Sequence, residues 1–255
     1  MKLTVLGCGT SSGVPRIGGD WGACDPDDPR NRRTRASILV QSGSTTILVD
    51  TGPDMREQLL AANVARIDAV LWTHEHADHT HGIDDLRQIF HLRREPVHCY
   101  ARQRTLESLE RRFRYVFHGR GGYPPTATIW PLEDVLTIGD IQVRTVDQPH
   151  GGITSAGFRF QKERESIGYS TDFHEITRDM EAMFTGLDIW VVDALRRAPH
   201  PTHANLAITL EAIGRLKPKR AILTHMDQSM DYRSLAAELP AGIEPGHDQL
   251  EITLS

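Results

Sequence analysis

The sequence contains little cysteine. Its 255 residues include three, Cys8, Cys24 and Cys99, which are far apart along the chain. This small, odd number argues against a disulfide framework and is typical of a protein in a reducing cytoplasm. No apolar run approaches the ~20 residues that a membrane helix needs. The first residues, MKLTVLG, reach glycine too early for the apolar core of a signal peptide. We therefore expect a soluble, cytoplasmic protein.

An excess of positive charge is also absent. The formal net charge is -5 at pH 7, so no overall basic field points to a long nucleic acid as partner. One basic run, RNRRTR (30–35), is interpreted as a solvated face in preference to a nucleic-acid patch. Hydrophobic residues make up 39% and charged residues 25%, as in ordinary globular proteins. This length and composition favour a single domain, 1–255.

Strand-like apolar runs and helical periodicity alternate along the chain. We expect strands in 3–7, 36–52 (a hairpin), 67–73, 97–101, 135–172, 187–195 and 220–226, and helices in 54–63, 82–92, 104–113 and 210–216. This order predicts an α/β (α+β) fold with two sheets back to back and helices outside. The glycine- and proline-rich stretch 118–127 is expected to be a loop, as a surface connection in preference to a substrate-contacting one.

The stretch WTHEHADHTHGIDD (72–85) concentrates histidines and acids directly after a buried strand. Residues i and i+2 share a face at a strand end, so His74 and His76 can hold one ion. The following loop can turn Asp78 and His79 towards a second. Because no thiolate is near, these nitrogen and oxygen ligands suit Zn²⁺, Mn²⁺ or Fe²⁺. His81 is expected to lie at the surface or behind the ligands.

Two ions need further ligands, and three other strand-like runs each end in a residue of the right type. VRTVDQPHG contains His150, SIGYSTD ends in Asp172, and RAILTHM contains His225. If only one of these three residues were present, it would be interpreted as an ordinary loop residue. An apolar strand that delivers one ligand to its carboxyl end is, however, how sheet edges build a site.

The motifs THEHADH, PHGG, YSTD and LTHM, with Asp50 in ILVDTG, resemble the metallo-β-lactamase superfamily over about residues 3–226. That family has an αββα four-layer sandwich fold. Within it, LGCGTSSGVP, GIDDLR and HPTHANL are most similar to the PhnP-type phosphodiesterases and the neighbouring RNase Z group.

The resemblance implies two divalent ions, zinc or manganese. It assigns the first to His74, His76 and His150, the second to Asp78, His79 and His225, and the bridge to Asp172. It makes Asp50 a carboxylate that orients ligands, although a turn residue is the alternative. PhnP itself also carries a structural zinc on clustered cysteines and a later histidine. Here Cys24 stands alone and Asp227 follows the last ligand, so we expect that third site to be lost.

For catalysis, the resemblance implies a metal-bridging hydroxide as nucleophile, with Asp78 and Asp50 among the catalytic residues. Its proposed general acid corresponds best to His203 in RRAPHPTHANL, and His200 is the runner-up. Arg87 and Arg196 are candidate phosphate contacts, although each is more often a surface ion-pair residue. Ser155, in GGITS, could add a hydroxyl.

The expected function is phosphodiester hydrolysis on small, nucleotide-like or cyclic substrates. One alternative is an RNase Z-like or exonucleolytic nuclease, against which the short 114–130 region and the acidic charge argue. A glyoxalase II-like thioesterase is a second, disfavoured because only 30 residues follow His225. A binding module without activity is a third, disfavoured because every implied ligand is present. The expected partner is a small phosphodiester or nucleotide, and a homodimer is expected only by analogy.

Overall fold

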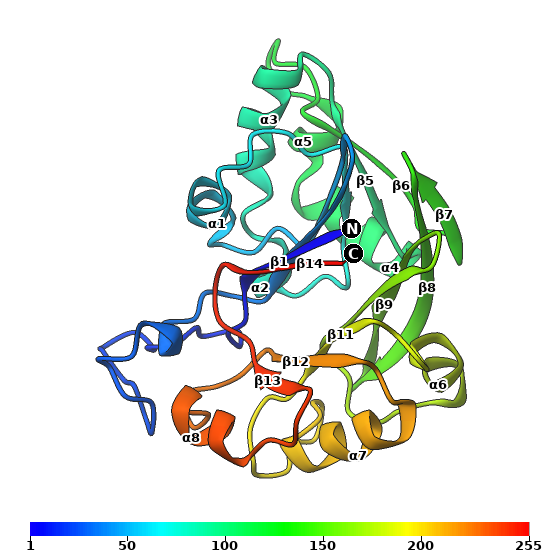
Figure 1. The fold of residues 1–255 in the computed structure, drawn as a ribbon. Helices are drawn as coiled ribbons and strands as arrows, with labels where there is room; N and C mark the ends of the chain where they lie inside the picture. Colours follow the sequence, from blue (N-terminus) through cyan, green and yellow to red (C-terminus); the bar gives the residue numbers. More distant parts are fainter. Residues whose placement is uncertain (255) are drawn as a thin grey trace.

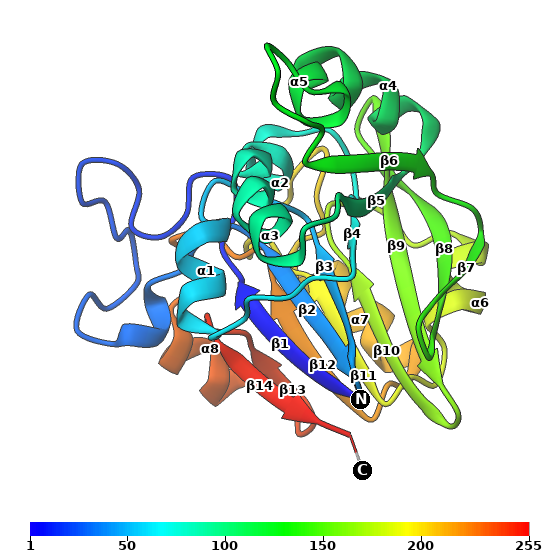
Figure 2. The ribbon, with the colours of Figure 1, turned by 90° about the horizontal axis from the view of Figure 1, so that it is seen from above.

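The first of two sheets contains the strands of the N-terminal half of the chain and one strand from its C-terminal end. The structure is a computed structural model that describes residues 1–254 (Figures 1 and 2). From edge to edge this sheet contains β14 (Leu250–Thr253), β1 (Lys2–Gly7), β2 (Ser37–Ser42), β3 (Thr45–Val49), β4 (Ala69–Leu71), β5 (Val97–Ala101) and β6 (Ala127–Pro131). The strands from β3 to β6 are parallel, so their carboxyl ends meet at one edge.

The second sheet contains most of the C-terminal half. Its order is β13 (Ile243–Pro245), β12 (Arg220–Thr224), β11 (Ile189–Asp193), β10 (Glu165–Ser170), β9 (Ile153–Lys162), β8 (Ile141–His150) and β7 (Val135–Ile138). The strands from β10 to β13 are parallel. Each sheet therefore offers a set of parallel strand ends on which a site can be built.

Helices cover the two outer faces, as Figure 1 shows. The first sheet packs against α1 (Met55–Ala61), α3 (Leu86–Arg93), α4 (Gln103–Arg112) and α5 (Arg114–His118). The second packs against α6 (Arg178–Phe184), α7 (Leu206–Leu216) and α8 (Tyr232–Glu238). A short α2 (Ala77–Thr80) and two 3-10 turns, Pro29–Asn31 and Ile83–Asp85, complete the set. The predicted fold class, a helix–sheet–sheet–helix sandwich, is confirmed.

Alternation of side chains along the strands separates the two cores. In β2, Ile38 and Val40 lie in the core between the sheets, whereas Leu39 lies in the core under the helices. In β3, Leu48 likewise faces the helices and Val49 faces the other sheet. Successive side chains of a strand point to opposite faces, so apolar residues at consecutive positions predict a sheet covered on both sides.

Most predicted elements are confirmed with shifts of a few residues at their ends. The elements that were not expected are short and of mixed polarity: β6, β13, β14, α5, α6 and α8. β6 is an edge strand whose Trp130 is exposed. The predicted loop 118–127 overlaps the last residue of α5 and the first residue of β6. No helix within residues 1–254 is long and apolar enough to cross a membrane.

The basic run 30–35 is a solvated face only in part: Arg32 is exposed and Arg30 and Arg35 are partly buried, but Arg33 is not solvated. Arg33 is 2% exposed, and its guanidinium donates to the carbonyls of Asp227 (3.3 Å) and Met230 (2.6 Å). It also donates to Asn31 Oδ1 (3.3 Å) and lies 3.9 Å from Cys24 Sγ. We call these five residues the Arg33 cluster. The sequence pattern failed because it shows charge but not the carbonyls that a folded chain brings to it.

Candidate metal centre

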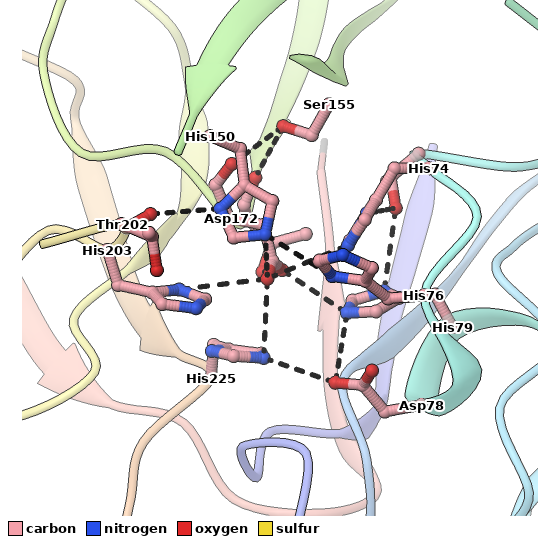
Figure 3. Close-up of polar contacts among 12 residues, drawn as sticks. His74, His76, Asp78, His79, His150, Ser155, Asp172, Thr202, His203 and His225 are labelled. Atoms are coloured by element: carbon pink, nitrogen blue, oxygen red, sulfur yellow. Dashed lines mark hydrogen bonds and ion pairs between the residues drawn. The ribbon is translucent and has the colours of Figure 1, made fainter. Parts of the chain in front are cut away.

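All the ligands predicted for the two ions converge at the edge where strands of both sheets end. Figure 3 shows Asp172 in the middle of this group, with imidazoles around it and Asp78 at its border. Four of these residues follow β4 and continue into α2: His74, His76, Asp78 and His79. The other three lie at the ends of β8, β10 and β12: His150, Asp172 and His225. Their Nε2, Nδ1 and carboxylate atoms form clusters that could hold metal ions, among them His74–His76–His150 and Asp78–His79–His225.

Three residues with acidic or imidazole side chains at the site have a left-handed backbone conformation. Asp50 (φ 65°), Asp172 (φ 57°) and His225 (φ 58°) each follow a strand, β3, β10 and β12 respectively. A non-glycine residue with positive φ is uncommon and costs free energy. Positive φ recurs at three strand ends that meet at one site. This indicates that the surrounding fold fixes the directions in which these three side chains point.

The separations between ligand atoms fit an ion better than direct contact. Asp172 Oδ1 lies 3.9, 3.7 and 3.7 Å from the Nε2 atoms of His74, His150 and His225. These distances exceed ordinary N–H···O hydrogen bonds. Ligands of a tetrahedral zinc ion lie roughly 3.4 Å apart when each bond is ~2.1 Å long. The Nε2 atoms of His74, His79 and His225 are also buried without a hydrogen-bond partner in the chain. The donor set therefore fits divalent metal ions.

Backbone and carboxylate acceptors fix which imidazole nitrogen is free for an ion. His150 Nδ1 lies 2.9 Å from the carbonyl oxygen of Thr202, which can only accept, so this nitrogen carries the hydrogen. His79 Nδ1 likewise donates to Asp50 Oδ2 at 2.7 Å. In both rings Nε2 is left with its lone pair towards the centre. Acceptors behind ligating histidines commonly hold the ring in this way.

Asp50 controls a second ligand through Thr73. The Thr73 hydroxyl donates to Asp50 Oδ2 (2.9 Å) and lies 3.0 Å from His74 Nδ1, whose hydrogen it can accept. Asp50 is fully buried, and burial raises the pKa of its carboxyl group even though His79 and Thr73 favour the charged form. The predicted orienting carboxylate thus contacts one ligand directly and another through a hydroxyl.

The centre is electrostatically suited to cations. Burial lowers the pKa of His225, but Asp172 and Asp78 outweigh it and raise that pKa to about 9. The same carboxylates, with Asp50, raise the pKa of His79 above its ordinary value against the effect of burial. The imidazoles in turn hold the pKa of Asp172 well below its usual range. Negative charge at Asp78 and Asp172 therefore attracts positive charge, whether protons or metal ions.

His203 lies at the centre and His200 lies behind it. His203 lines the metal pocket, stacks on His225 at 4.9 Å between ring centroids, and places Nδ1 3.1 Å from Asp193 Oδ2. His200 does not line this pocket, and its Nδ1 accepts the Thr202 backbone N–H at 3.3 Å. Burial lowers the pKa of His200. Of the two predicted candidates, only His203 faces the ligand set.

Asp193, a fully buried residue at the end of β11, was missed by the sequence reasoning. It accepts from His203 and also from the backbone N–H of Asp172 (3.0 Å), so it orients both. The available indication was its position, since it ends an apolar strand just as the predicted ligands do. Ser11 and Thr202 also line the pocket and were missed, although they lie in the motifs LGCGTSSGVP and HPTHANL that carry the resemblance.

The pocket beside the ligands is small, with a volume of about 230 Å³. Gly151 and Gly152 form part of its wall, together with Ile153. The expectation that Ser155 contacts substrate is wrong: it is 1% exposed and donates to the Asp172 carbonyl at 2.8 Å, behind the centre.

Arg87 and Arg196, the predicted phosphate contacts, do not line the metal pocket. Arg196 donates to the carbonyls of Ala198 and Pro199 in its own loop. Arg87 lines a separate cavity. His81 is exposed and contacts Phe113, as expected for a residue outside the ligand set.

Known proteins share both the sequence pattern and the fold. A family model described as the beta-lactamase superfamily domain matches residues 45–226. A crystal structure of a new diphosphatase from the PhnP family is 37% identical, covers 98% of this chain and 96% of that chain, and has a TM-score of 0.90.

Two curated relatives are each 33% identical. An octanoyltransferase of Porphyromonas gingivalis aligns over 258 residues, 98% of this chain and 51% of that protein. A ribonuclease Z of Bradyrhizobium sp. aligns over 138 residues, 52% of this chain and 46% of that protein. The chain thus spans about half the length of the curated relatives it matches.

Proposed function

Because this chain belongs to the beta-lactamase superfamily, we propose that it is a metal-dependent hydrolase of phosphodiesters, acting on small, nucleotide-like or cyclic substrates. The similarity to a PhnP-family diphosphatase over nearly the full length of both chains supports this substrate class. The small metal pocket supports a small diester or a chain end. We treat residues 1–255 as one domain of this fold.

We propose that the centre holds two ions, zinc or manganese. His74, His76 and His150 would hold the first, and Asp78, His79 and His225 the second, with Asp172 between them. When bound, such ions polarise the phosphoryl group and make water a stronger acid. The two aspartates balance only part of the charge of two divalent ions, so the loaded pocket favours an anionic, oxygen-rich substrate.

The remaining chemistry belongs to the chain. His203 would donate a proton to the leaving oxygen, because an alkoxide is too basic to leave unaided. Asp193 accepts from Nδ1 of His203, so Nε2 is the nitrogen left to carry the donated proton. The observation that carries this proposal is that His203 lines the metal pocket while its Nδ1 is held by the buried Asp193. A thioester would need no such acid, since a thiolate leaves readily.

A leaving-group comparison tests the role of His203. We expect His203→Ala to lower the turnover of an alkyl or nucleotide diester by about 10²–10⁴-fold. The loss on bis(p-nitrophenyl) phosphate should be much smaller, because nitrophenolate leaves without a proton. Metal content should stay unchanged, since His203 is not among the proposed ligands.

His200→Ala is the matched control, because this histidine is in the same loop but outside the pocket. It should lose little on either diester. Equal losses on both diesters in His203→Ala would show that His203 binds phosphate and is not the acid. A selective loss in His200→Ala would transfer the role to His200. Faster hydrolysis of a thioester than of any diester would contradict the substrate class.

Hydrolysis of a nucleic-acid strand by an RNase Z-like or exonucleolytic nuclease is the second candidate, and the ribonuclease Z relative favours a nuclease. The two candidates differ in whether the scissile bond is in a small molecule or at a strand end. An end-labelled single-stranded oligonucleotide and a 2′,3′-cyclic nucleotide, compared by kcat/KM, separate them. We do not propose octanoyl transfer, because this chain aligns with only 51% of the octanoyltransferase.

A further inference from the structure

A second cavity lies between α3, α5 and the loop 119–126. Its volume is about 710 Å³, within the range of small-molecule sites. Its lining shares no residue with the metal pocket. It includes three aromatic rings, two guanidinium groups and a carboxylate: Phe90, Tyr115, Tyr123, Arg87, Arg120 and Asp84.

A tight turn fixes one side of this cavity. The backbone N–H of Arg120 donates to the carbonyl of Tyr123 (3.1 Å), and the N–H of Tyr123 donates to the carbonyl of Arg120 (3.0 Å). Between them, Gly121 (φ 57°) and Gly122 (φ 87°) both have positive φ, as a type I′ turn requires. Arg120 and Tyr123 are thus directly opposite each other on a defined turn. Tyr123 is nevertheless 70% exposed.

The guanidinium groups face the cavity without acidic partners. The Arg87 guanidinium carbon lies 5.5 Å from the Tyr123 ring centroid, within range of a cation–π contact. Such a contact uses the face of the guanidinium and leaves its N–H edge free. Across the part of the chain that the structure describes, the side chains of Arg87 and Arg120 make no hydrogen bond or ion pair. These N–H groups are therefore available to an anion.

The one carboxylate in the lining is already engaged. Asp84 Oδ1 accepts the hydroxyl hydrogen of Tyr115 at 2.5 Å. Burial, together with this bond, raises the pKa of Tyr115 to about 12, so Tyr115 stays a neutral donor. Two arginines against one aspartate leave the named lining groups with net positive charge. An occupant should therefore combine a planar ring with negative charge.

We propose that this cavity binds a nucleotide, with the base stacked on Tyr123 and the phosphate between Arg87 and Arg120. Exposed aromatic rings stack on any nucleobase, and the planar fork of arginine matches phosphate oxygens. The nucleotide is either free or the terminal unit of a single strand. The site shares no residue with the metal pocket, so it does not depend on the proposed hydrolytic function.

Calorimetric titration of the metal-loaded protein with AMP tests the site. Tyr123→Ala should weaken AMP binding at this site by roughly 5- to 150-fold, the usual effect of losing one base–aromatic stack. Arg120→Ala should weaken it by about 10-fold or more. Adenosine and ribose 5-phosphate, each lacking half of the ligand, should both bind more weakly than AMP. Two exposed residues outside the cavity, Trp130→Ala and Arg164→Ala, are matched controls and should bind AMP as the wild type does.

The hydrolysis of bis(p-nitrophenyl) phosphate separates this site from the metal pocket. Tyr123→Ala should keep the wild-type rate, so a lost binding event with intact hydrolysis identifies the second cavity. If the wild type fails to hydrolyse the diester but binds AMP through Tyr123, the proposed function fails and this proposal stands. Tighter Tyr123-dependent binding of a five-nucleotide single strand than of AMP would support the site and assign the ligand to a strand end.

Two results would overturn the proposal. One is an AMP affinity that is the same in Tyr123→Ala as in the wild type. The other is a dimer, seen by sedimentation equilibrium, that dissociates in Tyr123→Ala, because the cavity would then be covered by a second copy of the chain.

Discussion

The metal centre and the Arg33 cluster lie close together, joined by the segment after β12, yet they balance charge differently. In the centre, carboxylates and imidazole nitrogens converge, and the Nε2 atoms of His74, His79 and His225 have no partner in the chain. In the Arg33 cluster, the chain supplies the cation itself, and the carbonyls of Asp227 and Met230 accept from it. His225 and Asp227 are two residues apart. His225 offers an unpartnered nitrogen at the metal centre, whereas the carbonyl of Asp227 accepts from the Arg33 guanidinium.

This difference shows where a cation can be exchanged. A guanidinium is permanently charged and covalently held, so it suits a cluster that only holds loop 9–35 against the second sheet. Ions that polarise a substrate need open positions beside them, and the metal centre borders a pocket. The Arg33 guanidinium also lies beside Cys24, where a third ion would have to bind.

Altering Asp172, the proposed shared ligand of the centre, should have the greatest effect. Asp172→Asn removes the negative charge between the two ligand groups. We expect metal content to fall and diester hydrolysis to drop roughly a thousand-fold, since bound ions contribute several kcal/mol to the transition state. Elemental analysis and kcat/KM measure both. Asp134→Asn, at an exposed aspartate, should change neither; unchanged hydrolysis in Asp172→Asn would remove this residue from the centre.

A change in the Arg33 cluster should affect stability and not metal content. Arg33→Met keeps much of the side-chain volume but leaves the carbonyls and Asn31 without their donor. We expect the free energy of unfolding to fall by about 3 kcal/mol, as when a buried charged hydrogen-bond partner is removed. Arg32→Met, one residue earlier but exposed, is the control in urea denaturation and should lose much less. Equal stability of the two variants would show that Arg33 does not hold the loop.

Asp248 shows a third way in which a buried charge is neutralised: its carboxylate takes up a proton. It accepts from the backbone N–H of Thr34 (2.7 Å) and of Cys8 (3.1 Å), yet burial raises the pKa of its carboxyl group from 3.8 to about 6. Below pH 3.8 the carboxyl is protonated whether the chain is folded or unfolded. Between 3.8 and 6 it ionises more readily in the unfolded chain, so its stabilising contribution falls as pH rises, by at most about 3 kcal/mol.

Asp248→Asn removes this titration. The difference in unfolding free energy between wild type and variant should therefore favour the wild type more at pH 4 than at pH 7. Urea denaturation at both values measures it, and the comparison cancels effects of pH on the metal centre, which both chains share. A difference that does not change with pH would contradict the assigned pKa.

The sequence predicted which residues converge at the proposed metal centre better than the shape of their surroundings. His150, Asp172 and His225 could be found because each ends an apolar strand, and parallel strand ends meet at one edge of a sheet. Asp193 has the same placement but no accompanying motif, so nothing separated it from an ordinary strand end. Ser155 was misassigned because the glycines before it indicate an approachable backbone, not the direction of the next side chain.

Long-range contacts explain the remaining failures. Arg33 lies in a basic run, which ordinarily indicates exposure, and only folding brings the carbonyls of 227–230 to it. Arg87 could be placed on a helix from periodicity, but the turn that brings Tyr123 to it is more than 30 residues later. The cavity between them depends on how α3 and α5 pack, which no local pattern encodes.

Counting metal in purified protein before and after chelation tests whether the metal centre binds two exchangeable ions and the Arg33 cluster none. We expect two ions per chain in the wild type, and diester hydrolysis that chelation abolishes and added zinc or manganese restores. Cys24→Ser should give the same count. Trace metal with chelator-resistant hydrolysis would contradict the assignment of the centre, and a third ion lost in Cys24→Ser would contradict that of the Arg33 cluster.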